Sequence, residues 1–208
     1  MTNSNNTKIN LKILEPTNHV ASWPEIQTII KSGQLPELRR TPECNDKYQL
    51  FKKNLASRNV SVAQHMLNQL GWNMDENNRL NQTGFPDLES KVKASFASRE
   101  SFKILQNDFP YSYDPQIVHL LIWSKIKLPI YKDESINLKN EELNSKINRF
   151  LKLNMEGREN VIDYDWFINY TVLQSIEAVS HIHLLVYLKD VESFDLKAFS
   201  TSFIPLSD

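Results

Sequence analysis

Two long apolar runs, residues 117–123 and 178–188, constrain the fold more than any other part of the sequence. The first reads Ile-Val-His-Leu-Leu-Ile-Trp and is rich in β-branched residues, which favour strands. A nearly continuous apolar run of this length is typical of a central strand that is buried on both faces. We therefore expect both runs to be strands, and the first to lie inside a sheet.

Both runs carry histidine, which an apolar strand rarely needs for packing. Side chains alternate between the two faces of a strand, so His181 and His183 fall on the same face, about 7 Å apart. By the same alternation, His119 on the first run shares a face with the later Lys125. If the two strands are neighbours, three histidines and one lysine converge on one side of the sheet.

Three readings of this cluster follow from its chemistry and stay open. Imidazole N–H groups, with Lys125 as a point charge, would bind a phosphate or a nucleotide. Neutral imidazoles at His119, His181 and His183 would bind a divalent metal. Alternatively, each histidine satisfies a backbone carbonyl group inside a half-buried core.

Residues 22–100 are predicted to be mainly helical. A first helix begins at Ser22, where Glu25 completes a capping box. The stretch 73–86 is rich in Asn, Asp and Gly and is predicted to be a loop. Apolar periodicity and the positions of glycine place the helices of this half at 22–33, 45–55, 61–71 and 87–97.

Residues 101–208 are predicted to form the sheet. A short strand and the central strand come first, and then a long amphipathic helix over 137–155 precedes a strand or turn and the histidine strand. This order favours an α+β fold, in which an antiparallel sheet in the C-terminal half is covered by helices. We expect one α+β domain over 10–208, preceded by a disordered tail at 1–9.

The bulk properties limit the classes of partner and compartment. The formal net charge of −1 gives no field that would attract nucleic acid or an anionic membrane. No run reaches the roughly 18 apolar residues of a membrane span, and the polar first residues are unlike a signal peptide. The single cysteine, Cys44, fits a reducing compartment. We therefore expect a cytoplasmic protein with no nucleic-acid or membrane partner.

Parts of the C-terminal half resemble the two signatures of the histidine-triad superfamily. The first signature is an Asn-x-x-Pro turn, here at 107–110, followed by a strand with His119 and then a basic residue, Lys125. The second is a Gln-Ser/Thr-Val step, here at 174–176, followed by His181-Ile-His183. This resemblance implies a HIT-like sheet.

By this resemblance, His183 would attack the α-phosphorus of a nucleotide and His181 would support the phosphate, with no cofactor or metal. Leu185 departs from the pattern, because it stands where the superfamily has a third histidine. Leucine neither donates nor accepts a hydrogen bond, so protonation of the leaving oxygen would fall to another group. The cluster and the signatures together make six further residues candidates for substrate binding: His119, Lys125, Asn107, Asn169, Gln174 and Ser175.

A closer resemblance covers nearly the whole chain. The segments that carry it are 38–42, 70–72, 107–111, 117–125, 166–169 and 181–183. They look like the fungal N-acetylglucosamine-induced protein family, which is defined by a domain of unknown function. The resemblance implies a fungal cytoplasmic protein linked to amino-sugar metabolism.

Together these features predict a cytoplasmic protein that binds a nucleotide or nucleotide-sugar phosphate. The predicted activity is that of a nucleotidyl hydrolase or transferase, with His183 as the nucleophile. The predicted partner is therefore a small molecule, and a homodimer is compatible with this prediction. The alternatives are a non-catalytic binding or regulatory protein on a degenerate HIT-like fold, and a histidine-based metal site. The neighbouring Arg39 and Arg40 could reach a ligand phosphate, but an exposed pair at a helix end is the favoured prediction.

Overall fold

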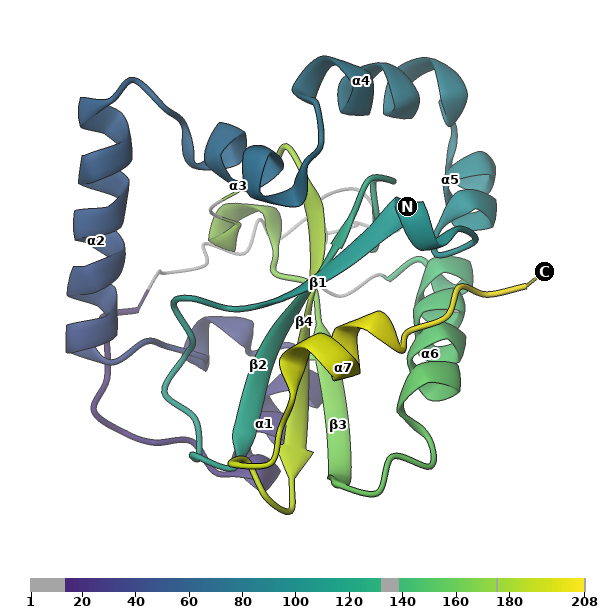
Figure 1. The fold of residues 1–208 in the computed structure, drawn as a ribbon. Helices are drawn as coiled ribbons and strands as arrows, with labels where there is room; N and C mark the ends of the chain where they lie inside the picture. Colours follow the sequence, from purple (N-terminus) through teal and green to yellow (C-terminus); the bar gives the residue numbers. More distant parts are fainter. Residues whose placement is uncertain (1–13, 132–138, 175, 208) are drawn as a thin grey trace, which may run out of the picture.

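A four-stranded antiparallel sheet lies at the centre of the computed structural model, which describes residues 14–131, 139–174 and 176–207 (Figure 1). Its strands are β1 Phe102–Gln106, β2 Ile117–Ser124, β3 Val161–Phe167 and β4 Ser180–Leu188, in the spatial order β1-β2-β4-β3. The predicted α+β class is confirmed. The predicted tail, 1–9, lies outside the described residues.

Helices α1 to α5 precede the sheet in the chain, as predicted for the N-terminal half. The helices are α1 Trp23–Ser32, α2 Pro42–Ser57, α3 Val62–Leu70, α4 Met74–Arg79, α5 Leu88–Ala94, α6 Glu141–Met155 and α7 Leu196–Thr201. Shorter helical segments are η1 Leu35–Glu37, η2 Leu80–Gly84, η3 Arg99–Ser101 and η4 Thr171–Leu173. None of the helices that the structure describes is long and apolar enough to cross a membrane.

The two apolar runs pair with each other as β2 and β4, the central strands of the sheet. Every residue of β2 is buried, as expected for a strand covered on both faces. In the register of this pair, Leu121 lies opposite His183 and Trp123 lies opposite His181. The alternation along both strands therefore places the histidines of β2 and β4 on one face, as the sequence predicts.

The other face of the sheet packs on α6 and α7. Ile147, Phe150 and Leu151 of α6 are fully buried against alternate residues of the central strands, such as Ile122 and Ile182. Each such side chain contributes about 1.5–3 kcal/mol when it is removed from water. Helix α6 begins at Glu141 rather than at the predicted residue 137, because Asn140 caps it through a hydrogen bond from the backbone N–H of Leu143.

The histidine face of the sheet is covered by the N-terminal helices. Trp23 of α1 stacks on Tyr187 of β4, and its indole N–H donates to Asp163 of β3 (3.0 Å), so α1 covers one part of this face. Leu67 and Leu70 of α3 pack in a separate apolar cluster over the other part. The Ser22 start and the Gly33 end of α1 are both as predicted, with Gly33 in the left-handed region at φ 72°.

The predicted loop over 73–86 is wrong, because this segment forms α4 and the π-helical turn η2. Its asparagines act as caps and buried hydrogen-bonding groups. Asn73 accepts hydrogen bonds from the backbone N–H groups of Asp75 and Glu76 at the start of α4. The buried Asn81 donates to the carbonyl oxygen of Lys125 (2.7 Å) and accepts from the backbone N–H of Lys127 (2.7 Å).

We expect Asn81→Leu to lower the free energy of unfolding by about 2–4 kcal/mol, because it leaves buried backbone groups without partners. Asn78→Leu is the matched control, because Asn78 is an exposed position of the neighbouring helix α4 and should change stability by less than about 0.5 kcal/mol. Urea denaturation measures both values. Equal effects of the two substitutions would contradict this role of Asn81.

Candidate functional site

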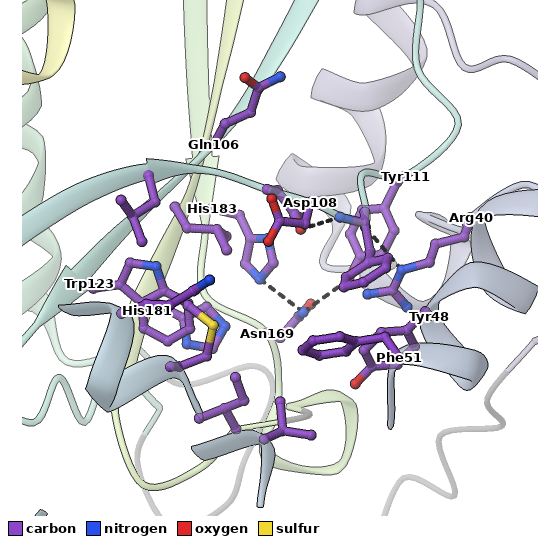
Figure 2. A pocket seen from close by; sticks show the side chains of 18 of the residues that line it. Arg40, Tyr48, Phe51, Gln106, Asp108, Tyr111, Trp123, Asn169, His181 and His183 are labelled. Carbon is purple, nitrogen blue, oxygen red and sulfur yellow. Dashed lines mark hydrogen bonds between the residues drawn. The ribbon is translucent and has the colours of Figure 1, made fainter. Parts of the chain in front are cut away.

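A cavity of about 600 Å³ lies between the histidine face of the sheet and helices α2 and α3 (Figure 2). Its aromatic and apolar walls come mainly from Tyr48 and Phe51 of α2, Met66 of α3, Phe109 and Tyr111. A few polar side chains interrupt these walls. Such a mainly apolar cavity with a small number of placed polar groups is the usual form of a small-molecule site.

Two of the predicted histidines are bonded to each other beneath this cavity. Nε2 of His119 lies 2.9 Å from Nδ1 of His183, so one neutral ring donates a hydrogen bond to the other across the β2–β4 pair. The Asn169 amide nitrogen lies 3.1 Å from Nε2 of His183, and that of Asn107 lies 3.3 Å from Nδ1 of His119. All four side chains are buried. Both ring nitrogens of His183 therefore have partners.

Burial keeps the three histidines uncharged. It lowers the pKa of His119 to about 3 and that of His181 to about 4. It also lowers the pKa of His183 well below its ordinary value. The cluster therefore supplies neutral donors and acceptors at neutral pH, and it supplies no positive charge to a phosphate.

His181 differs from the other two histidines because one of its nitrogens has no hydrogen-bond partner among the described residues. Its Nδ1–H donates to the carbonyl oxygen of Val179 (3.2 Å), which leaves a lone pair on Nε2. No residue that the structure describes is hydrogen-bonded to this Nε2. The imidazole packs against the indole of Trp123, with 4.5 Å between ring centroids. Nε1 of Trp123 is buried, and it too has no partner among the described residues.

Arg40 is the functional candidate that the sequence analysis assigned to the surface. It lines the cavity and is only half exposed. Its Nε–H donates to the carbonyl oxygen of Phe109 (3.0 Å), and its guanidinium carbon lies 4.5 Å from the Tyr48 ring centroid and 5.3 Å from that of Tyr111. Within the described part of the chain, no carboxylate pairs with it. Arg39 instead pairs with Glu37 (3.6 Å).

The sequence offered one signal that could have found Arg40. It directly precedes α2, whose aromatic residues Tyr48 and Phe51 line the same cavity. An arginine guanidinium group is often held over the face of an aromatic ring. The signal was weak because only the fold brings the loop at 107–111 against α2.

The structure brings five of the eight predicted site residues together: His119, His181, His183, Asn107 and Asn169. Gln174 donates to the backbone oxygen of Asn169 (2.7 Å) and lines an adjacent cavity of about 300 Å³. Lys125 lies past the end of β2, with Nζ 5.6 Å from the Trp72 ring centroid, and it lines other cavities. Strand alternation does not extend to Lys125, because the strand ends at Ser124. Ser175 lies outside the described residues.

The alternative of a histidine-based metal site finds no support in this geometry. In the described ranges, no group of three or more His, Cys, Asp or Glu side chains is arranged to hold a metal ion. Instead, His119 and His183 use facing nitrogens to bond to each other.

Comparison with known proteins places this fold and site in a family. The model of a protein family of unknown function, DUF3605, matches residues 22–187, which include nearly all of the sheet and all but one of the residues that line the cavity. The chain belongs to this family. None of the comparisons bears on the predicted resemblance to the histidine-triad superfamily, which stays a prediction.

Relatives of the DUF3605 protein include two curated fungal proteins and one solved structure. An uncharacterized protein of Saccharomyces cerevisiae is 34% identical over 168 residues, which are 79% of this chain and 78% of that protein. N-acetylglucosamine-induced protein 1 of Candida albicans is 32% identical over 179 residues, 82% of this chain and 69% of that protein. The crystal structure of HTC1 matches with a TM-score of 0.64 and 30% identity, over 89% of this chain and 99% of that one.

The buried histidines predict a pH dependence of stability. Between about pH 6.5 and about pH 4, the unfolded chain binds a proton at His181 that the folded protein does not, so the free energy of unfolding falls as the pH falls. We expect His181→Phe to flatten the curve by up to about 1.4 kcal/mol per pH unit. Urea denaturation across this range measures it. His65→Gln is the control on α3, and parallel curves for wild type and His181→Phe would contradict the prediction.

Proposed function

We propose that this protein binds a phosphorylated small molecule, a nucleotide or a sugar phosphate, in the cavity above the histidines. The observation that carries the proposal is Arg40, a half-buried cation that lines the cavity and has no carboxylate partner in the described part of the chain. A guanidinium group offers a planar set of N–H donors that fits a phosphate. Asp108 also lines the cavity, but it is exposed to solvent and is not paired with Arg40.

The surroundings of Arg40 support a ligand that has a ring next to its phosphate. Tyr48, Phe51, Phe109 and Tyr111 all line the cavity near the guanidinium group. Aromatic rings of this kind stack on a base or on the apolar face of a sugar. The cavity volume of about 600 Å³ is in the range of sites for ligands of this size.

Binding without turnover is the function that the geometry of His183 supports best. A nucleophile needs a free nitrogen, and in His183 both nitrogens are hydrogen-bonded, to His119 and to Asn169. Attack by His183 on phosphorus would first require one of these buried bonds to break. The histidine-triad reading, with nucleotidyl transfer through His183, remains a separate hypothesis that the same experiments test.

The name of the Candida albicans relative guides the choice of ligands. That protein is named for induction by N-acetylglucosamine, so phosphates of amino sugars belong in the panel beside nucleotides and nucleotide sugars. We also propose a cytoplasmic location, for which the single cysteine is the supporting feature.

We expect Arg40→Gln to weaken binding of the best phosphorylated ligand by about tenfold to a hundredfold, the effect of losing a charge-assisted hydrogen bond. Arg39→Gln is the matched control and should leave the affinity unchanged, because Arg39 pairs with Glu37. Titration calorimetry measures the affinities, after a panel screen by thermal stabilisation selects the ligand.

Two results would overturn the proposal. The first is that no nucleotide or sugar phosphate binds to the full-length chain at millimolar concentration. The second is that Arg39→Gln and Arg40→Gln weaken binding equally. Release of product from a bound nucleotide or nucleotide sugar would instead favour the nucleotidyl-transfer hypothesis.

A further inference from the structure

The two ends of the cavity differ in chemistry. Figure 2 shows Arg40 with Tyr48 and Tyr111 at one end, and His181 with Trp123 at the other. The proposed phosphate accounts for the positive charge of Arg40 at the first end. The second end holds polar atoms for which the proposed function gives no role.

His181 and Trp123 supply one acceptor and one donor, on rings whose centroids lie 4.5 Å apart. The hydrogen bond from Nδ1–H of His181 to Val179 fixes the tautomer, so Nε2 accepts a hydrogen bond. The Trp123 indole can only donate, and its Nε1–H is buried without a partner among the described residues. An unpaired buried donor is costly, and a ligand oxygen that accepts from it removes that cost.

The wall around this pair is apolar. Val62 and Met66 of α3, Leu121 of β2 and Ile176 line the same part of the cavity and belong to one cluster over the sheet. A ligand group that fits here needs one N–H or O–H donor, one acceptor and a small apolar part. A hydroxyl group leaves the apolar wall without a contact.

We infer that the His181–Trp123 end recognises a secondary amide with a small alkyl group, such as the acetamido group of a phosphorylated N-acetyl sugar. The amide N–H donates to Nε2 of His181, the amide oxygen accepts from Nε1 of Trp123, and the methyl group contacts Met66 and its apolar neighbours. The inference rests on the proposed function, because the phosphate at Arg40 determines which end of the ligand reaches His181.

A matched pair of ligands tests this inference on the full-length chain. The pair is 2-acetamido-2-deoxyglucose 6-phosphate and glucose 6-phosphate, which differ only in the acetamido or hydroxyl group. We expect the wild-type protein to bind the acetamido ligand about tenfold more tightly in titration calorimetry. His181→Phe keeps a ring against Trp123 but removes the acceptor, so it should weaken binding of the acetamido ligand and reduce this preference.

Trp123→Phe gives the second measurement, because it removes the donor while an aromatic ring remains. It should also reduce the preference, and circular dichroism with a melting curve establishes that each variant is folded. His65→Phe on α3 is the control and should keep the wild-type preference, because His65 does not line the cavity.

The outcomes separate this inference from the proposed function. Equal binding of both phosphates by the wild type, with loss of both in Arg40→Gln, would overturn the amide assignment and leave phosphate binding intact. An unchanged preference in folded His181→Phe and Trp123→Phe would do the same. Failure of both phosphates to bind, while other nucleotides bind through Arg40, would also reject the amide site. Failure of every phosphorylated ligand would overturn the proposed function and this inference together.

Discussion

The hydrogen bond between His119 and His183 is the contact on which the rest of the site depends. It joins the two central strands at 2.9 Å, inside a region that excludes water. Both imidazoles are neutral there, and the amide nitrogens of Asn107 and Asn169 lie beside the ring nitrogens at the two ends of the pair. A shift of one residue in the β2–β4 register would move one of the two rings to the opposite face and leave polar atoms of both unpaired.

This buried network also fixes the loops that form the cavity. Asn107 accepts from the backbone N–H of Phe109 (3.0 Å), and Arg40 donates to the carbonyl oxygen of the same residue. On the opposite side, the Asn169 amide donates to the Tyr111 hydroxyl (3.0 Å). The histidine pair is thus connected to Arg40 through Asn107 and the backbone of Phe109. Preorganisation of this kind lowers the entropy lost when a ligand binds.

Much of the sheet and part of the site could be predicted from the sequence, because both rest on local patterns. Alternation along an apolar strand is enough to place His181 and His183 on one face, and the Ser22 and Gly33 signals fix the ends of α1. Arg40 could not be assigned, because its neighbours come from distant segments. Asn81 was misread for a related reason: an asparagine that caps or bonds to a distant strand has the same sequence signal as one in a loop.

The walls and the floor of the cavity come from opposite halves of the chain. Helices α2 and α3 supply one side, and β2 and β4 supply the other. Neither half contains a complete binding surface, so the cavity appears only after the long-range contacts of the fold have formed. A bound ligand would consequently act as a non-covalent crosslink between the two halves and stabilise both against unfolding.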